Sequence, residues 1–381
     1  MSNVPKNMLQ FGRHFYNTIS NIMSGTEQSK EPEVQLPFNM QYHDSDRYQP
    51  SLEDVLTVKN ILYTLRPDSP LPLELIDTIL DLSEYWPHTT TAFPLSSHQE
   101  PTINREIIVR AGGAGEDRLI LRSLPIGCIK GNNDQAFQMP SENQTQYFTQ
   151  ERKPWPKDRE IPQNATEEVL KKWAETSQIR GGFPCKKIVF RIKSHDQGWG
   201  GVRADKGTYR GSYTWFDVGL ERTYAAREAK PFYNDPEFRL PNTGEQASGS
   251  MNEIICALQT IIPDVQNNPN YNPENTTNPR AQNPLMFKHG LNPDNTYLQK
   301  NKTATSASQE HTIVWRFNDD IHPESPEADD LEAQGRGRES ANGDFVRNLK
   351  TGDVVTVWAK ARYPGWANTV EEVSIDVYWA I

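Results

Sequence analysis

The chain has 381 residues, of which 40 are basic and 50 acidic, so its formal net charge is -10. This balance argues against broad binding to nucleic acid, which needs clustered lysine and arginine, and no apolar run approaches the roughly 20 residues that cross a bilayer. Three scattered cysteines (Cys128, Cys185, Cys256) exclude a disulfide framework and a multi-cysteine zinc module, whereas nine tryptophans are an unusual excess.

Residues 1–50 are polar and lack a sustained hydrophobic period, which predicts a flexible N-terminal segment. The first residues have no charged region followed by an apolar stretch, so we expect no secretory signal. Unpaired cysteines suit a reducing compartment. The sequence therefore predicts a cytoplasmic protein that contacts neither membranes nor nucleic acid.

Residues 51–90 predict a helical hairpin. Ser51 and Asp54 form a capping box, and leucine, valine and isoleucine follow at helical spacing until Pro67 ends the first helix. A second helix begins at Leu71 and continues to Trp86. Each helix has one apolar face, so the two helices are expected to pack against each other.

Residues 100–381 carry the strand signals. Strands are predicted at 106–110, 118–122, 186–194, 211–220, 312–317, 353–362 and 370–381, and apolar and polar residues alternate in 186–194, 312–317, 353–362 and 370–381. Alternation means one buried and one solvated face, which is typical of antiparallel sheets. The predicted fold class is therefore mainly β (α+β): an antiparallel β-sandwich or jelly roll with a small N-terminal helical hairpin and long loops.

Other segments within this region predict helices, turns and loops. Asn164 begins a helix that continues through Ala174, and Ser250 begins an apolar helix over 254–262 that Pro263 ends. Six prolines and many asparagines indicate that residues 263–295 are a long loop or insertion. Residues 340–344 read as a turn that enters a strand at 345–347.

Two segments share one design at a strand end. Lys193 and Lys360 are each followed, five and six residues later, by Gly-Trp, at Gly198-Trp199 and Gly365-Trp366. The pattern predicts two equivalent corners of the sandwich, with a tryptophan that either packs on the sheet or offers a platform to a sugar or a peptide. The candidate ligand-binding residues lie at or near these corners: Asp196, Trp199, Arg203, Tyr209, Trp215, Asp217, Trp366 and Asn368.

Catalytic motifs are missing from the sequence. His195-Asp196 and His322 with its neighbouring acids lack metal-ligand spacing, no G-x-S-x-G occurs, and the cysteines have no supporting motif. A carboxylate pair for glycoside hydrolysis cannot be chosen among 50 acidic residues. We therefore expect no catalytic residue, no metal ligand and no cofactor.

A short motif in the second helix resembles the opening of the F-box. The motif is Leu71-Pro72-Leu73-Glu74-Leu75, followed by Ile79-Leu80, and covers about ten residues. Members of that family dock this helical element on an adaptor of a ubiquitin ligase and carry a recognition domain behind it, in some cases a glycan-binding β-sandwich. The resemblance implies adaptor contacts by Leu71, Pro72, Leu75, Ile79 and Leu80. The same motif is also a good helix start by itself, with proline at the entry and glutamate in the first turn.

A longer pattern resembles a family of uncharacterised fungal cytosolic proteins. It runs from the Leu71–Pro87 segment through residues 194–201 and 213–217 to residues 358–366 and 377–379, and it spans roughly residues 70–381. The resemblance implies an F-box-like helix joined to a tryptophan-rich sandwich, without a known activity.

Together these features favour a non-catalytic cytosolic recognition or adaptor protein whose sandwich loops bind a glycan or a protein. Two alternatives stay open at this point. One is a glycosidase-like hydrolase with a carboxylate pair on the sandwich, and the other is a structural or self-assembling protein.

Overall fold

The computed structural model describes residues 48–93, 106–113, 115–129, 144–155, 165–226, 238–240, 254–274 and 283–381. Most of the predicted N-terminal segment, residues 1–50, lies outside these ranges. The chain divides into two compact units, one of residues up to His88 together with Ala380–Ile381, and one of Thr89–Trp379.

The first unit contains the predicted pair of helices, α2 (Leu52–Thr64) and α3 (Leu73–Leu82). Its capping box is present, because the Asp54 amide donates to Ser51 Oγ at 3.1 Å and the Ser51 amide donates to Asp54 Oδ2 at 2.9 Å. An ion pair of 2.9 Å between Lys59 and Asp77 connects the two helices. Local capping and apolar spacing thus sufficed to locate both elements.

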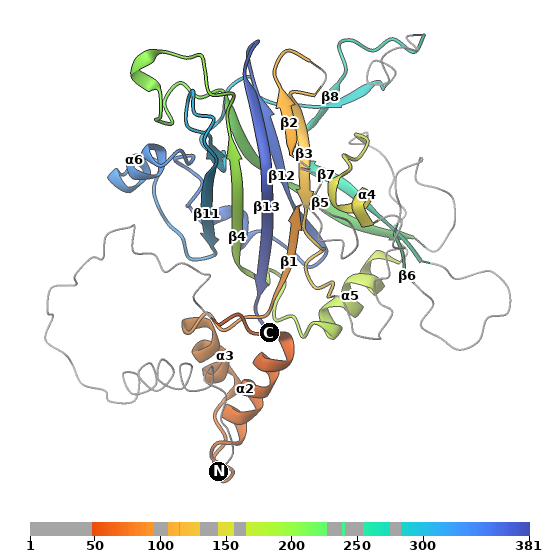
Figure 1. Ribbon diagram of the computed structural model, residues 1–381. Helices are drawn as coiled ribbons and strands as arrows, with labels where there is room; N and C mark the ends of the chain where they lie inside the picture. The colour runs from red at the N-terminus through yellow and green to blue at the C-terminus, as the bar shows by residue number, and fades with distance from the viewer. Residues whose placement is uncertain are drawn as a thin grey trace, which may run out of the picture. The chain divides into compact units, whose positions relative to one another are not determined.

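The second unit is a β-sandwich of two packed antiparallel sheets (Figure 1). The β13 sheet has the order β1 (His88–Phe93), β13 (Ala367–Trp379), β4 (Cys185–His195), β11 (Gln309–Arg316), with β2 (Ile107–Arg110) also pairing with β13. The β5 sheet has the order β3 (Asp117–Arg122), β12 (Asp353–Ala361), β5 (Thr214–Ala226), β7 (Ile254–Ile262), β6 (Phe238–Leu240), with β10 (Gln299–Lys300) also pairing with β5.

The alternating residues of both sheets meet in one core. Val355, Val357, Ala359 and Ala361 of β12 are buried there with apolar residues of the β13 sheet, namely Ile188, Phe190, Ile192, Val373, Ile375 and Val377. Each buried valine, isoleucine or phenylalanine among them contributes about 1.5–3 kcal/mol of burial free energy. The predicted fold class, a mainly β antiparallel sandwich with small N-terminal helices, is confirmed.

The predicted helix over 254–262 is wrong, because this segment is strand β7. Most of its side chains are β-branched or aliphatic, and β-branched residues are stiff at χ1 and fit a pleated sheet. The strand pairs with β5 along one side and with β6 along the other. The period of a short apolar run is the same for a buried strand and for a buried helix segment. Here the pairing with β5 and β6 makes the segment a strand.

The Pro/Asn-rich insertion at 263–295 contains more structure than a long loop. Its described residues include β8 (Val265–Asn267) and β9 (Leu285–Phe287), which form a two-stranded sheet. Phe287 packs against Leu119 and Trp358 of the β5 sheet. The insertion therefore covers the outer face of this sheet, where the polar contacts described below are buried.

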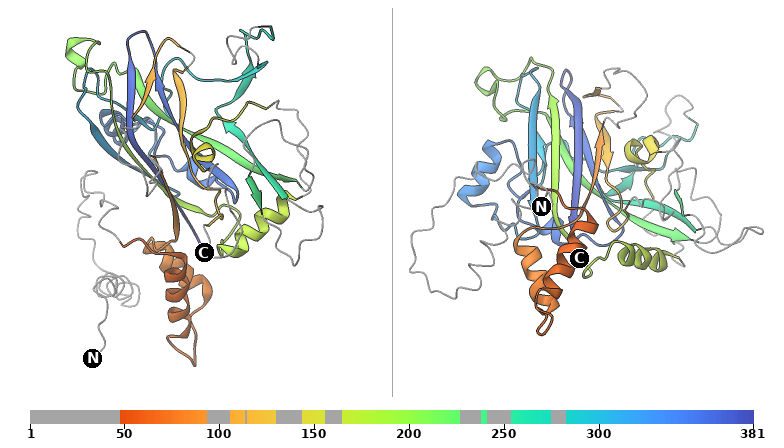
Figure 2. Two further views of the ribbon diagram at one scale, coloured as in Figure 1. Left: turned by 45° about the vertical axis from the view of Figure 1, so that its right-hand side comes forward. Right: turned by 60° about the horizontal axis from the view of Figure 1, so that its bottom comes forward.

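Short helices decorate the sandwich: α4 (Gln144–Thr149), α5 (Thr166–Thr176), α6 (Pro326–Ala333) and α7 (Asp344–Arg347). Helix α5 confirms the element that Asn164 predicts, although Asn164 itself lies outside the described residues. The predicted strand at 345–347 is wrong, because these residues belong to α7, which follows the left-handed Gly343. Helix α6 lies beside the edge strand β11 (Figure 2).

Candidate functional site

The two Gly-Trp corners meet at one end of the sandwich. The first corner, residues 196–201, follows β4, and the second, residues 362–366, joins β12 to β13. Gln197 connects them, because its Oε1 accepts from the Ala367 amide at 2.9 Å and its Nε2 donates to the Trp199 carbonyl at 2.6 Å. The two corners predicted from the sequence are thus in contact with each other.

Gly365 allows the Trp199 ring to lie over the second corner. Its φ is +95°, and a Cβ at this position would lie 2.9 Å from the Trp199 ring. Both the backbone conformation and the close approach require glycine. Trp199 is 62% exposed although its backbone carbonyl is bound by Gln197 and its ring approaches Gly365.

Exposed aromatic rings continue from Trp199 along the second corner. Tyr363 is 49% exposed, and its ring contacts the Tyr213 ring edge to face at 4.5 Å between centroids. Tyr213 also contacts Trp366 at 5.2 Å, and Trp366 itself is buried. We call Trp199, Tyr213 and Tyr363 the aromatic corner surface. Sequence reasoning missed Tyr213 and Tyr363, although Tyr363 occupies the position in its corner that Asp196 occupies in the first.

Asp196 is a buried anchor of the first corner. Its carboxylate accepts three backbone N–H bonds, from Gly198 at 2.8 Å, Thr305 at 2.7 Å and Ala304 at 2.6 Å. Burial raises the pKa of Asp196, and the three N–H donors oppose this by favouring the charged form. Since every one of these bonds is within the chain, Asp196 fixes the corner and does not face a ligand.

Asn368 belongs to a buried polar cluster beneath the corners. It accepts from Asn301 Nδ2 at 2.9 Å and donates to the Trp215 carbonyl at 3.1 Å. Asn301 in turn accepts from Ser194 Oγ at 2.7 Å. A buried polar cluster whose members pair with one another rigidifies the fold, and Asn368 is not a surface residue.

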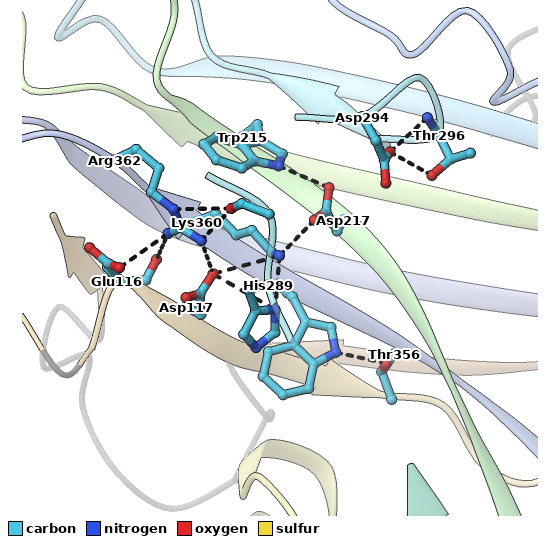
Figure 3. A network of polar contacts seen from close by, with 12 residues as sticks. Glu116, Asp117, Trp215, Asp217, His289, Asp294, Thr296, Thr356, Lys360 and Arg362 are labelled. Atoms are coloured by element: carbon cyan, nitrogen blue, oxygen red, sulfur yellow. Dashed lines mark hydrogen bonds and ion pairs between the residues drawn. The ribbon is translucent and has the colours of Figure 1, made fainter. Parts of the chain in front are cut away.

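Trp215 and Asp217 join a network around Lys360 on the outer face of the β5 sheet (Figure 3). Lys360 Nζ lies 2.8 Å from Asp217, 2.9 Å from His289 Nδ1 and 3.6 Å from Asp117. Trp215 Nε1 donates to Asp217 at 2.9 Å. Burial raises the pKa of Asp217, and the neighbouring Lys360 ammonium opposes this rise.

The network bears on the hydrolase alternative, because Asp117 and Asp217 are the acids that it brings together. Arg362 binds Asp117 at 2.6 Å and Lys360 binds Asp217 at 2.8 Å, so each carboxylate is already paired with a cation of the chain. A pocket of 360 Å³ beside the network is lined by Asp117 and not by Asp217. The arrangement thus favours a structural role that ties β3, β5 and β12 to the insertion.

The two remaining predicted residues, Arg203 and Tyr209, differ in exposure. Arg203 is exposed on a short 3-10 turn, and Tyr209 is half-buried with its ring 6.0 Å from the His311 ring. Burial lowers the pKa of His311 to about 4. Of the eight predicted ligand-binding residues, the structure therefore leaves two on the surface, Trp199 and Arg203, and places the others wholly or partly in internal contacts.

The predicted adaptor-docking residues also differ in exposure. Pro72 and Leu75 are exposed, Leu71 is half-buried, and Ile79 and Leu80 are buried. The exposed residues leave room for a partner, whereas the buried ones belong to packing. Adaptor docking stays a prediction.

Within the described ranges, His, Cys, Asp and Glu do not gather in groups of three that could hold a metal ion. Among the helices of those ranges, none is long and apolar enough to span a membrane.

The fold and the corners define a tryptophan-rich β-sandwich with exposed aromatic rings at one end. No protein-family model, no curated protein and no solved structure matches the chain. The resemblances to the F-box and to the fungal family therefore stay predictions, and the function is argued from the site.

Proposed function

We propose that this protein is a non-catalytic recognition module that binds a carbohydrate by stacking on the aromatic corner surface. The observation that carries the proposal is Trp199, a large ring 62% exposed at a corner whose backbone is bound by Gln197. Exposed apolar residues that gather in one place mark recognition sites, and here Tyr363, 49% exposed, lies on the corner whose Gly365 the Trp199 ring approaches.

The chemistry of the surface favours a sugar. One face of a pyranose presents C–H groups and its rim presents hydroxyls, so it matches an amphipathic ring with polar neighbours. Tyr363 supplies a second ring and a hydroxyl, which lies 3.5 Å from Asn292 Oδ1. Because the corner is held before binding, little conformational entropy is lost when a ligand stacks.

The proposal includes a cytoplasmic location. Cys128, Cys185 and Cys256 are all free and buried, which supports a reducing compartment. The ion pairs around Lys360 support a role without catalysis, because Asp217 and Asp117 are each held by a cation of the chain.

The test is a glycan array probed with the labelled protein, followed by calorimetric titration of the retained glycan. We expect Trp199→Ala to weaken binding at least tenfold and Trp199→Phe to keep part of it. The matched control is Phe183→Ala, because Phe183 is also an exposed aromatic residue, 55% exposed, but precedes the opposite end of β4.

Circular dichroism and thermal unfolding confirm that each variant is folded. Failure of the array to retain the protein on any glycan, or equal glycan affinity of Trp199→Ala and wild type, contradicts the proposal. If the same surface captures a protein and no glycan, the ligand is a protein and the carbohydrate proposal is wrong.

A further inference from the structure

A pocket of 450 Å³ lies between the two sheets, at the edge formed by β11. Val218 and Leu220 of β5 line it together with Trp315 of β11, and Phe345 and Leu349 of the α7 region line it from another side. Its volume is within the roughly 300–1,000 Å³ typical of small-molecule sites, and its lining is largely apolar. None of the residues of the aromatic corner surface lines it.

Two polar side chains of this lining lack a hydrogen-bond partner. Trp315 is 5% exposed and Ser340 is 7% exposed, and among the described residues neither Trp315 Nε1 nor Ser340 Oγ has a partner. A buried donor without an acceptor costs free energy, and most such groups in proteins are satisfied. An oxygen acceptor on a ligand in this pocket would satisfy them.

The charges around the pocket limit the ligand. The lining contains two acids, Glu339 and Asp344, and no lysine or arginine. Both acids already have partners, since Asp344 binds Arg347 at 2.7 Å and Glu339 accepts from Asn295 at 3.2 Å. A ligand carboxylate would thus meet acidic neighbours and no free cation, which disfavours an anion.

From this geometry we propose that the pocket between β5, β11 and α7 is a second binding site, which takes a small, uncharged, mainly apolar molecule with one oxygen acceptor. The acceptor receives a hydrogen bond from Trp315 Nε1 or Ser340 Oγ, and the apolar body contacts Val218, Leu220 and Ile262. The site is independent of carbohydrate binding, and its test does not use a sugar.

The test uses the neutral fluorescent ketone 6-propionyl-2-(dimethylamino)naphthalene as the probe. We expect saturable binding with one site per chain, weakened at least tenfold by Ile262→Trp, which places a large ring at the pocket. Ile108→Trp is the matched control, because Ile108 and Ile262 are similarly exposed, at 43% and 42%, and Ile108 lies on β2, away from this lining.

The hydrogen bond is tested by Ser340→Ala and Trp315→Phe. We expect one or both to weaken binding of the ketone about tenfold and to leave unchanged the binding of the matched 6-propyl-2-(dimethylamino)naphthalene, in which CH2 replaces the carbonyl. In wild type, the indole N–H resonance that Trp315→Phe removes should shift when the ketone binds. Thermal unfolding separates these effects from loss of the fold, and the spectrum of wild type does not depend on how any variant folds.

Three results would overturn the proposal. They are the absence of saturable binding of the ketone by folded wild type, equal ketone affinity of folded Ile262→Trp and wild type, and equal affinity for the ketone and for 6-(dimethylamino)-2-naphthoate. The last result would refute the uncharged class of ligand, because the naphthoate anion should be disfavoured by the acidic lining.

Discussion

The two Gly-Trp corners have the same sequence pattern and opposite exposures. In the first corner Trp199 is 62% exposed while Asp196 is fully buried; in the second, Trp366 is 9% exposed while Tyr363 is 49% exposed. The lysines that begin the two patterns differ in the same way. The side chain of Lys193 is 31% exposed and lies 3.4 Å from Glu371, whereas that of Lys360 is 5% exposed within its network.

The shared pattern therefore specifies the backbone turn, and it does not specify which side chains of the corner are exposed. Gly198 and Gly365 both have positive φ, at +84° and +95°, and so both corners turn at the same position. What covers each corner comes from elsewhere in the chain. Lys360 lies on β12, which is flanked by β3 and β5 and covered by His289 of the insertion, and Trp366 is covered by Tyr213.

The largest expected difference between the corners is at the lysines. Lys360→Met leaves Asp217 without its cation in a largely desolvated site, so we expect the free energy of unfolding to fall by about 3–4 kcal/mol. We place it at the lower end of the range for buried pairs because the Asp217 side chain keeps 27% exposure. Lys193→Met is the matched variant and should leave the urea midpoint close to that of wild type, since surface ion pairs contribute little.

Urea unfolding followed by circular dichroism measures both variants. If both variants lose the same free energy of unfolding, the Lys360 network is as solvated as the surface pair of Lys193. The two lysines would then not differ as we expect.

The next difference is at the tryptophans. Trp366→Ala removes a ring packed against Tyr213 and should lower the free energy of unfolding by about 3 kcal/mol. Trp199→Ala removes an exposed ring and should cost less than about 1 kcal/mol. Chemical denaturation of the two single variants and the double variant gives both values. If Trp199→Ala lowers the free energy of unfolding more than Trp366→Ala does, Trp199 is the packing ring and our assignment of the two rings is wrong.

The fold was predictable from the sequence because apolar and polar residues alternate in its strands. The alternating Val355, Val357 and Ala359 of β12 lie in the core, although the other face of β12 is buried as well. The error at β7 has a physical cause, since Ile254–Ile262 is apolar on both sides and its strand pairing with β5 and β6 is not visible in a local pattern.

The site was predictable only in part. The Gly-Trp pattern located both corners and Trp199. Whether each polar residue is exposed or buried depends on partners that are distant in the sequence. Asp196 is bound by amides of residues 304 and 305, and Asn368 by Asn301, more than 60 positions away in each case. The pairing of Asp217 with Lys360 likewise depends on the register of β5 and β12, which no local pattern discloses.

The most direct measurement is hydroxyl-radical footprinting with mass spectrometry, on the free protein and on the protein saturated with the glycan that it retains. We expect rapid oxidation of Trp199 in the free protein and strong protection in the complex, with Trp366 oxidised slowly in both. Bound glycan with an unchanged oxidation rate at Trp199 would contradict the claim that the aromatic corner surface is the recognition site.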